Sequence, residues 1–202
     1  MARLLRLLTA LLLLLGLLAG CALPARVPIS EPDHLLAAPA AGGEQLWRIK
    51  ILRGEKMRFT GLLGTRREGG GLYYVLLDGS GVTLLEARLT AGGEYQPIRE
   101  LAIFRDHRLP EFLAQSLHRI FLLQPAATPC GRNLLLRFCR EETNTQGMKK
   151  FAKLGPLPLW RVDYAGQPAT LAANLTGITF TNPWLRVTLL LTRDQERIDA
   201  GD

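Results

Sequence analysis

Apolar and polar residues alternate along most of the chain after residue 43, and this pattern predicts β-strands. Successive side chains of a strand point to opposite faces, so a period of two places the apolar residues on one face. In the first half, the residues that share a predicted face are Met57, Phe59 and Leu63, then Thr83, Leu85, Ala87 and Leu89. In the second half they are Leu134, Leu136 and Phe138; Trp160, Val162 and Tyr164; Ile178 and Phe180; and Leu185, Val187, Leu189 and Leu191.

Glycine-rich segments separate the first of these strands. They are Gly69–Gly71, Asp78–Gly81 and Ala91–Gly93, each flanked by an alternating segment. Glycine and aspartate favour the tight turns that connect antiparallel strands. Three such turns in close succession predict an antiparallel meander.

A different period appears between Leu109 and Leu123. Its apolar residues recur at intervals of three and four, and they are Phe112, Leu113, Leu117, Ile120 and Phe121. Pro110 stands at the start of this segment and Pro125 follows its end, as is typical of helix boundaries. The segment is predicted to be an amphipathic helix.

These elements predict a mainly β fold of the α+β class. We expect a curved antiparallel half-barrel sheet whose concave face is covered by the central helix, because an amphipathic helix must bury its apolar side. The segment Leu72–Leu77 has apolar side chains on both faces of the predicted strand, so we expect both of its faces to be covered.

The first residues have the organisation of an export signal. Arg3 and Arg6 precede the leucine-rich segment Leu7–Leu18, which is shorter than the roughly 20 apolar residues that span a bilayer. Small residues follow, and Cys21 comes directly after Gly20. We predict a signal peptide at residues 1–20; an ordinary secretory signal without lipidation is the alternative.

The end of this segment, Leu18-Ala19-Gly20-Cys21, resembles the lipobox of bacterial lipoproteins. The resemblance implies cleavage before Cys21 and attachment of lipid to that cysteine, through which the protein would be anchored in a membrane. Ala22 stands where many lipoproteins retained in the inner membrane have aspartate. The periplasmic face of the outer membrane is therefore the expected location.

The composition divides the rest of the chain into three parts. Residues 21–43 contain Pro24, Pro28, Pro32 and Pro39 before Ala40–Gly43, and they are predicted to form a flexible tether. Residues 44–193 form the predicted folded domain, and residues 194–202 a frayed polar tail.

The charge of the chain is compatible with a lipid surface. The formal net charge is +7, and it stays positive after loss of Arg3 and Arg6. Anionic headgroups attract such a protein, although a solvated basic surface explains the charge equally well. Basic residues interleaved with aromatic ones are not evident, so nucleic acid is not an expected partner.

Two cysteines remain once Cys21 carries lipid. Cys130 and Cys139 are expected to form a disulfide in an oxidising compartment, the alternative being two buried thiols. A metal site is not expected, because His107 and His118 are isolated and His34 lies in the tether. We expect no cofactor.

Several of these features together resemble the LolA/LolB superfamily of lipoprotein carriers, and more closely a family of short outer-membrane lipoproteins related to it. They are the lipobox, the meander from Phe59-Thr60-Gly61 to Leu77-Asp78-Gly79, the Leu109-Pro110 helix and the closing strands. The similarity covers about Glu44–Thr192. It implies a half-barrel with a hydrophobic cavity that accepts acyl chains and needs no reactive groups.

The resemblance also implies partners and a site. The cargo would be an acylated molecule or a glycolipid, and a periplasmic carrier protein could exchange it. The candidate lining residues of the cavity are Phe59, Leu63, Leu85, Phe112, Leu117, Ile120, Phe121, Leu136, Phe138, Ile178, Phe180, Val187 and Leu189. Each of these could instead be an ordinary core residue. The loops Arg66–Gly71 and Gly79–Gly81 lack the protruding leucine of the superfamily's membrane receptor, which favours a different lipidic cargo.

Two other functions compete with a carrier. Ser80 lies between glycines, but a hydrolase nucleophile elbow requires a strand followed by a helix, and Asp106-His107 resembles a turn before a helix. We therefore expect no enzyme. The second alternative is a docking subunit of an envelope assembly, with Leu72–Leu77 as its interface. Trp47, Trp160 and Trp184 could contribute to either function, although tryptophans are also ordinary core residues.

Overall fold

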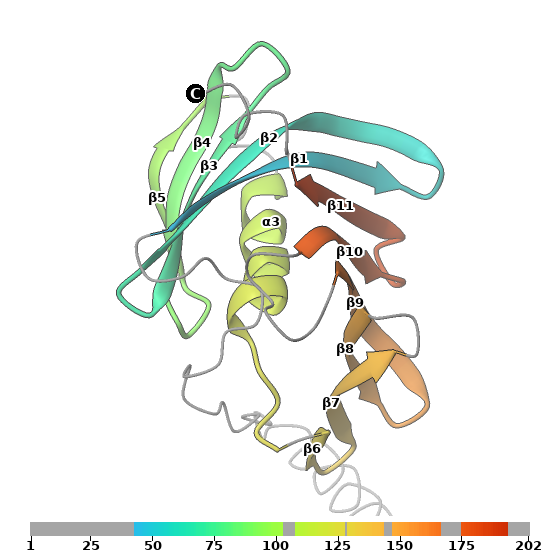
Figure 1. Ribbon diagram of the computed structural model, residues 1–202. Coiled ribbons are helices and arrows are strands. Elements are labelled where there is room, and N and C mark those ends of the chain that lie inside the picture. The colour runs from blue at the N-terminus through green and yellow to red at the C-terminus, as the bar shows by residue number, and fades with distance from the viewer. Residues whose placement is uncertain (1–42, 103–107, 128, 144–146, 167–174, 194–202) are drawn as a thin grey trace, which may run out of the picture.

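The computed structural model describes residues 43–102, 108–127, 129–143, 147–166 and 175–193 (Figure 1). The predicted signal peptide, Cys21, nearly all of the tether and the polar tail lie outside these residues. Within them, no helix is long and apolar enough to cross a membrane. The mainly β prediction is confirmed in its coarser form: one open, curved antiparallel sheet of eleven strands accompanies a short helix.

The strands of the first half are β1 (Glu44–Arg53), β2 (Lys56–Glu68), β3 (Gly71–Leu77), β4 (Thr83–Leu89) and β5 (Tyr95–Glu100). The helical segment consists of α3 (Leu109–Leu117) and η1 (His118–Leu122). The strands of the second half are β6 (Cys130–Asn133), β7 (Leu136–Thr143), β8 (Gly147–Leu154), β9 (Leu157–Gly166), β10 (Leu175–Asn182) and β11 (Val187–Arg193).

The order of the strands explains the position of the helix. The sheet runs β5-β4-β3-β2-β1-β11-β10-β9-β8-β7-β6, so β1 and β11 pair at its centre and β5 and β6 form its edges. The chain leaves one edge after β5 and reaches the other edge at β6. The connection between them contains α3, which lies inside the curve of the sheet (Figure 1).

The predicted helix is confirmed in position, but its form changes along its length. Residues 109–117 are α-helical, and the following five residues form a π-helical turn in which the Leu123 N–H donates to the His118 carbonyl at 2.8 Å. Pro125 has no N–H with which to continue this pattern to the Ile120 carbonyl. Side chains from the sheet satisfy that oxygen instead, as shown below.

Rows of cross-strand neighbours build the core on the inner face of the sheet. One row places Ile51, Leu189, Phe180, Val162 and Lys150 side by side across β1, β11, β10, β9 and β8. All five are buried. The period of two in the sequence placed Val162, Phe180 and Leu189 on inward faces, as predicted, whereas Ile51 and Lys150 were not among the predicted residues.

The segment Leu72–Leu77 departs from expectation on its outer face. Leu72, Tyr74 and Leu76 are buried on the inner face, whereas Tyr73, Val75 and Leu77 are only half-buried. The prediction that both faces are covered therefore holds for the inner face and only in part for the outer one. Strand neighbours shield the outer residues in part, as where the Tyr73 hydroxyl donates to Glu86 Oε1 at 2.7 Å.

Candidate functional site

Much of the predicted cavity is filled by side chains that pack against one another. Most of the thirteen candidates are buried core residues, namely Leu63, Leu85, Leu117, Ile120, Phe121, Phe138, Ile178, Phe180 and Leu189. Phe59 is partly buried and packs against this core, and Leu136 is half-exposed on β7. The remaining two, Phe112 and Val187, line an open space, and this space is the candidate site.

The space is a cleft between the first turns of α3 and the adjoining ends of β1, β2 and β11. Its lining residues are Ile51, Arg53, Arg58, Arg108, Leu109, Glu111, Phe112, Gln115, Leu185 and Val187. Its volume is about 720 Å³, within the range of small-molecule sites. We call it the helix–hairpin cleft.

Local structure positions the walls of the helix–hairpin cleft. The β1–β2 turn bends at Gly54, where φ is +61°, and the Gly54 N–H donates to the Arg186 carbonyl of the β10–β11 turn at 2.7 Å. This bond holds the two hairpins together on one side of the cleft. On the other side, the Phe112 ring meets the Phe180 ring edge-on with centroids 6.4 Å apart, which fixes the helix over the sheet.

The exposed charged residues that line the helix–hairpin cleft, which we call its mouth, are mostly basic. Arg53, Arg58 and Arg108 line it together with a single carboxylate, Glu111. Guanidinium groups stay charged and present parallel donors to a carboxylate or phosphate. The cleft can therefore hold an apolar chain while its mouth binds an anionic group. These arginines were not among the residues predicted from the sequence, where their only signal is their position beside a turn and at a helix start.

A buried lysine fastens the far end of the helical segment. Lys150 Nζ donates to the Ile120 carbonyl at 2.8 Å and the Leu123 carbonyl at 3.0 Å. The Tyr164 hydroxyl donates to the same Ile120 oxygen at 2.5 Å. Burial lowers the pKa of Lys150 well below its usual value, and the charge of Arg140 lowers it further. These bonds satisfy carbonyls that the end of a helix leaves without partners.

Lys150 was not among the residues predicted from the sequence, although the sequence contains a signal for it. Alternate positions of β8 are occupied by Met148, Lys150 and Ala152, so the lysine lies on the same face of the strand as two apolar residues. A charged residue on the buried phase of a strand indicates a specific polar partner in the interior.

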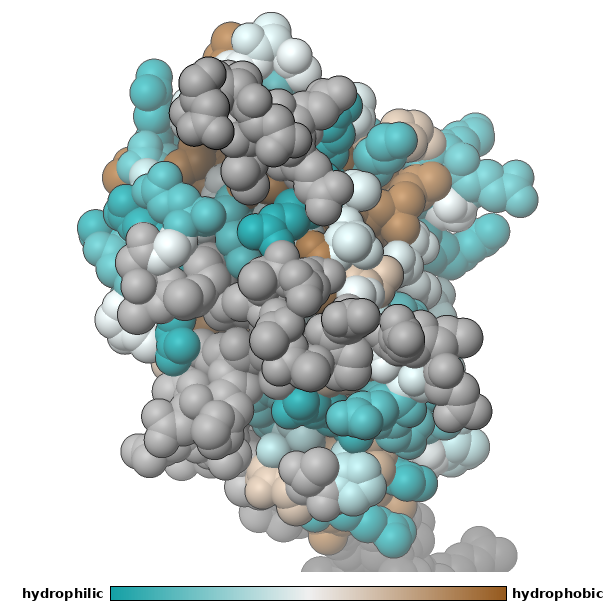
Figure 2. Space-filling view, in the orientation of Figure 1, coloured by the Kyte–Doolittle hydropathy of each residue, from teal (hydrophilic) through white to brown (hydrophobic). Residues whose placement is uncertain are grey.

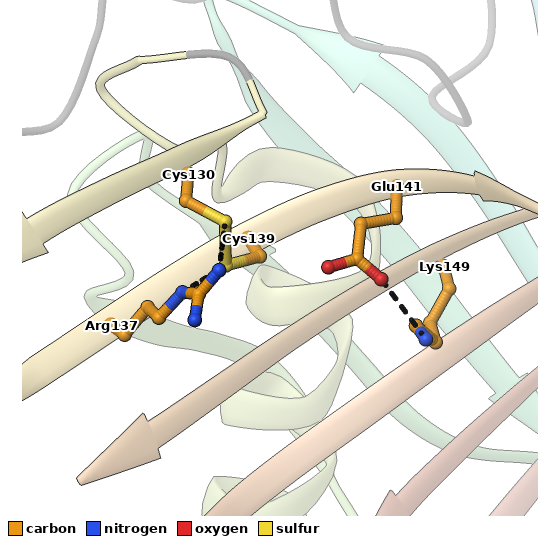
Figure 3. The surroundings of a disulfide bond; sticks show 5 residues. All are labelled: Cys130, Arg137, Cys139, Glu141 and Lys149. Carbon is orange, nitrogen blue, oxygen red and sulfur yellow. Dashed lines mark hydrogen bonds and ion pairs between the residues drawn. A yellow bond between two sulfur atoms is a disulfide. The ribbon is translucent and has the colours of Figure 1, made fainter. Parts of the chain in front are cut away.

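A disulfide joins Cys130 and Cys139, which lie opposite each other on β6 and β7 (Figure 3). The Arg137 guanidinium points at both sulfurs, at 3.2 Å from Cys139 Sγ and 3.4 Å from Cys130 Sγ. These cysteines and Glu141 are the group of potential metal ligands found among the described residues. Bonded sulfurs offer no thiolate to a metal, and Glu141 pairs with Lys149 at 3.1 Å.

Removing this disulfide should loosen the β6 edge of the sheet. β6 has four residues and pairs with β7 alone, so little else holds it. We expect the double substitution Cys130→Ser/Cys139→Ser to lower the free energy of unfolding by about 2 kcal/mol, because a short closed loop is opened. Urea unfolding of the variant and of reduced wild-type protein should give the same loss. An unchanged midpoint in both would contradict a stabilising role.

Ser80 forms part of a hairpin turn. Asp78 Oδ1 accepts hydrogen bonds from the Ser80 hydroxyl at 2.7 Å, the Ser80 N–H at 2.8 Å and the Val82 N–H at 2.9 Å. The Ser80 hydroxyl and the Val82 N–H lower the pKa of Asp78. The serine lies between strands β3 and β4, whereas the hydrolase elbow requires a helix after the serine.

The remaining candidates are dispersed. His118 Nε2 lies 3.0 Å from the Ala91 carbonyl, and burial lowers the pKa of this imidazole. Trp47 is buried and donates to Thr65 Oγ1 at 3.3 Å, and Trp160 packs against Phe138. His34, Asp106 and His107 lie outside the described residues.

No protein-family model and no curated protein sequence matches this chain.

Proposed function

We propose that this protein is a membrane-anchored lipoprotein that binds an acylated molecule and passes it on without changing it chemically. The observation that carries the proposal is the helix–hairpin cleft, whose inner walls are apolar and whose mouth holds Arg53, Arg58 and Arg108. The acyl chain would lie against Leu109 and Val187, and its anionic group would meet the arginines. An uncharged acyl compound would lack the contact with the arginines and would bind less tightly.

The chemistry of such a site is partition. Each methylene group buried from water contributes about 0.8 kcal/mol, so a chain of moderate length binds reversibly without any reactive residue. Charge-assisted bonds from guanidinium groups add orientation, because they hold the polar end at the mouth. The cargo class that fits best is an acyl chain with a carboxylate or phosphate group.

The wider features of the chain agree with this assignment. An open curved sheet with a helix inside its curve has the arrangement of the half-barrel that the LolA/LolB resemblance implies. Lipid on Cys21 would anchor the protein at the periplasmic face of the outer membrane, where acylated molecules are exchanged. β1 begins at Glu44, so the folded domain starts directly after the proposed tether.

The alternative of a docking subunit has less support from the structure. Its proposed interface was Leu72–Leu77, and three of these six residues are buried in the core while the other three are half-buried. That strand therefore offers little apolar surface to a partner. The cleft favours a carrier over this alternative.

Reversing the charge at the mouth of the helix–hairpin cleft should weaken the binding of anionic cargo and leave the binding of uncharged cargo nearly unchanged. We expect Arg58→Glu/Arg108→Glu to reduce affinity for a fluorescent fatty acid at least about tenfold, since two charge-assisted contacts become repulsive. Affinity for the corresponding fatty alcohol should change little. Fluorescence titration at low salt measures both.

The matched control for this pair is Arg99→Glu, because Arg99 is exposed on the edge strand β5 and does not line the cleft. It should leave both affinities unchanged. Equal binding of the fatty acid by the wild type and the cleft variant would show that the arginines do not hold the cargo.

A further inference from the structure

Large apolar side chains are exposed at one end of the sheet. The described residues with such exposure are Met57, Val82, Leu134, Leu135, Leu154, Leu157, Trp184, Leu185 and Ile98. All except Ile98 lie in or beside five hairpin turns: β1–β2, β3–β4, β6–β7, β8–β9 and β10–β11. We call these eight residues the apolar rim.

The strand order places the five turns at the same end. Turns of an antiparallel meander alternate between the two ends of a sheet, so β1–β2 and β3–β4 share one end. Because β1 pairs with β11, the β10–β11, β8–β9 and β6–β7 turns fall at that end as well. Three of these turns follow one another down the right side of Figure 1.

Hydrogen bonds connect neighbouring turns along the apolar rim. Besides the bond from Gly54 to Arg186, the Trp184 indole N–H donates to the Pro158 carbonyl at 2.6 Å. The Gly155 N–H donates to the Leu135 carbonyl at 2.8 Å. Four of the five turns, from β1–β2 through β10–β11 and β8–β9 to β6–β7, are therefore joined into one margin, and the β3–β4 turn lies at the same end of the sheet.

The opposite end of the sheet has another composition. Its described turns, β2–β3 and β4–β5, consist of Gly69–Gly70 and Thr90–Glu94, without a large apolar residue. Two ion pairs lie toward this end, Arg66–Glu44 and Arg88–Glu68, each 3.2 Å. Among the described residues, the exposed large apolar side chains other than Ile98 therefore lie at one end of the sheet.

Basic side chains surround the apolar rim. They are Arg53, Lys56, Arg58, Arg132, Lys153 and Arg186, against Glu55 and Asp78, whose carboxylate is engaged within its own turn. Figure 2 shows hydrophobic and hydrophilic residues side by side along the right margin of the molecule. An apolar margin with excess positive charge complements an interface of acyl chains and anionic headgroups.

The β10–β11 turn presents its apolar residues rigidly. Asn182 Oδ1 accepts hydrogen bonds from the Trp184 N–H at 3.1 Å and the Leu185 N–H at 3.2 Å. Trp184 is 61% exposed although its indole N–H is bonded. A tryptophan held outward beside arginines is the residue type that anchors proteins at the membrane–water boundary.

We propose that the apolar rim docks on a membrane surface that contains anionic lipid. Docking would turn the mouth of the helix–hairpin cleft toward the bilayer, because Arg53, Arg58 and Leu185 belong to that mouth and lie at the same end. Docking does not depend on cargo binding. A protein partner would fit the exposed leucines, but the ring of basic residues favours phospholipid headgroups.

The tether is long enough for this orientation. β1 starts at the end opposite the apolar rim and extends about 30 Å at roughly 3.3 Å per residue. Residues 21–43, extended at about 3.1 Å per residue, reach roughly 70 Å. A chain anchored through Cys21 can therefore bring the rim down onto the same membrane.

Vesicle flotation tests the proposal without the lipid anchor. All described strands and the helical segment lie between Glu44 and Arg193, so a chain from residue 22 onward retains the whole fold. It is mixed with vesicles of phosphatidylcholine alone or with added phosphatidylglycerol. We expect binding to the anionic vesicles, weakened at least about tenfold by Trp184→Ser/Leu185→Ser and, independently, by Leu134→Ser/Leu135→Ser.

The control substitution is Ile98→Ser, because Ile98 is 48% exposed but lies within β5, away from the apolar rim. It should bind as the wild type does. Trp184 also reports insertion directly, since Trp47 and Trp160 are buried and brominated lipids should quench the exposed indole alone. Circular dichroism checks that each variant is folded.

The proposal is overturned by no binding to anionic vesicles, by equal loss of binding in Ile98→Ser, or by an unquenched Trp184 in bound protein. Capture of a stoichiometric protein through the rim, with no affinity for vesicles, would also overturn it. None of these outcomes bears on the cargo site, which the fatty-acid titration tests separately.

Discussion

Replacing Lys150 with alanine is expected to lower the free energy of unfolding by about 3 kcal/mol, a loss comparable to breaking other buried charged contacts. The substitution removes both hydrogen bonds from Nζ and empties the space of its aliphatic chain. The Leu123 carbonyl loses the bond from Nζ, and the Ile120 carbonyl keeps that from Tyr164. The helical segment should therefore detach more readily from β8 and β9.

A graded series separates the causes of this loss. Tyr164→Phe removes one hydroxyl while Lys150 still bonds the Ile120 oxygen, so it should cost about 1 kcal/mol. Lys150→Met keeps most of the side-chain volume and should lie between the two. Urea unfolding followed by circular dichroism measures all three. Equal stability of Lys150→Ala and wild type would mean that the lysine does not hold the helical segment.

The pH dependence of the free energy of unfolding gives a second test of the role of Lys150. The folded pKa of Lys150 is lowered, so the unfolded chain binds more protons between that pKa and about 10.4, the value in an unfolded chain. Stability should therefore rise with pH in that window. The difference between wild type and Lys150→Met should grow between neutral pH and the upper end of the window, whereas a constant difference would contradict a lowered pKa.

Adding a methyl group at Gly61 should be comparably damaging. A Cβ there would collide with the Leu77 carbonyl oxygen and lie 2.8 Å from Cζ of the Phe59 ring. The carbonyl belongs to the backbone of β3, so it moves only if the β2–β3 pairing is disturbed. We expect Gly61→Ala to lower the free energy of unfolding by at least about 2 kcal/mol.

Gly64→Ala is the matched control for this prediction. Gly64 lies three residues further along β2, and a Cβ there would have its nearest neighbour, the Val75 carbonyl oxygen, at 3.9 Å. That is ordinary contact, so stability should stay equal or rise slightly, because alanine restricts the unfolded chain. Thermal unfolding compares the two variants. Similar losses in both would indicate a general cost of alanine in β2 and no collision at Gly61.

The sequence predicts the elements of this fold well where local chemistry decides them. The three glycine-rich turns each connect consecutive strands, from β2 through β5. The alternation at Thr83–Leu89 coincides with β4, and the period of three and four residues locates the helical segment. These features depend on neighbours within a few residues, which is why a periodic pattern detects them.

The site depends on contacts that no local pattern contains. Arg53 and Arg58 join Arg108 at one cleft because β1 pairs with β11 at the centre of the sheet and the chain returns across its face. The predicted lining residues lie on the inner side of the molecule, as expected. Core residues and cavity-lining residues have the same apolar pattern in the sequence, so the pattern alone does not tell them apart. How far α3 fills the interior is decided by packing, as at Leu113 and Leu117.

Native mass spectrometry with lipid extraction tests the central claim most directly. The chain from residue 21 onward, carrying Cys21→Ala, is purified so that its own anchor cannot occupy the helix–hairpin cleft. A co-purified acyl species of defined mass, retained by Arg99→Glu and lost from Arg58→Glu/Arg108→Glu, is the result that the carrier account predicts. A protein that carries no lipid and takes up no fluorescent fatty acid would contradict it.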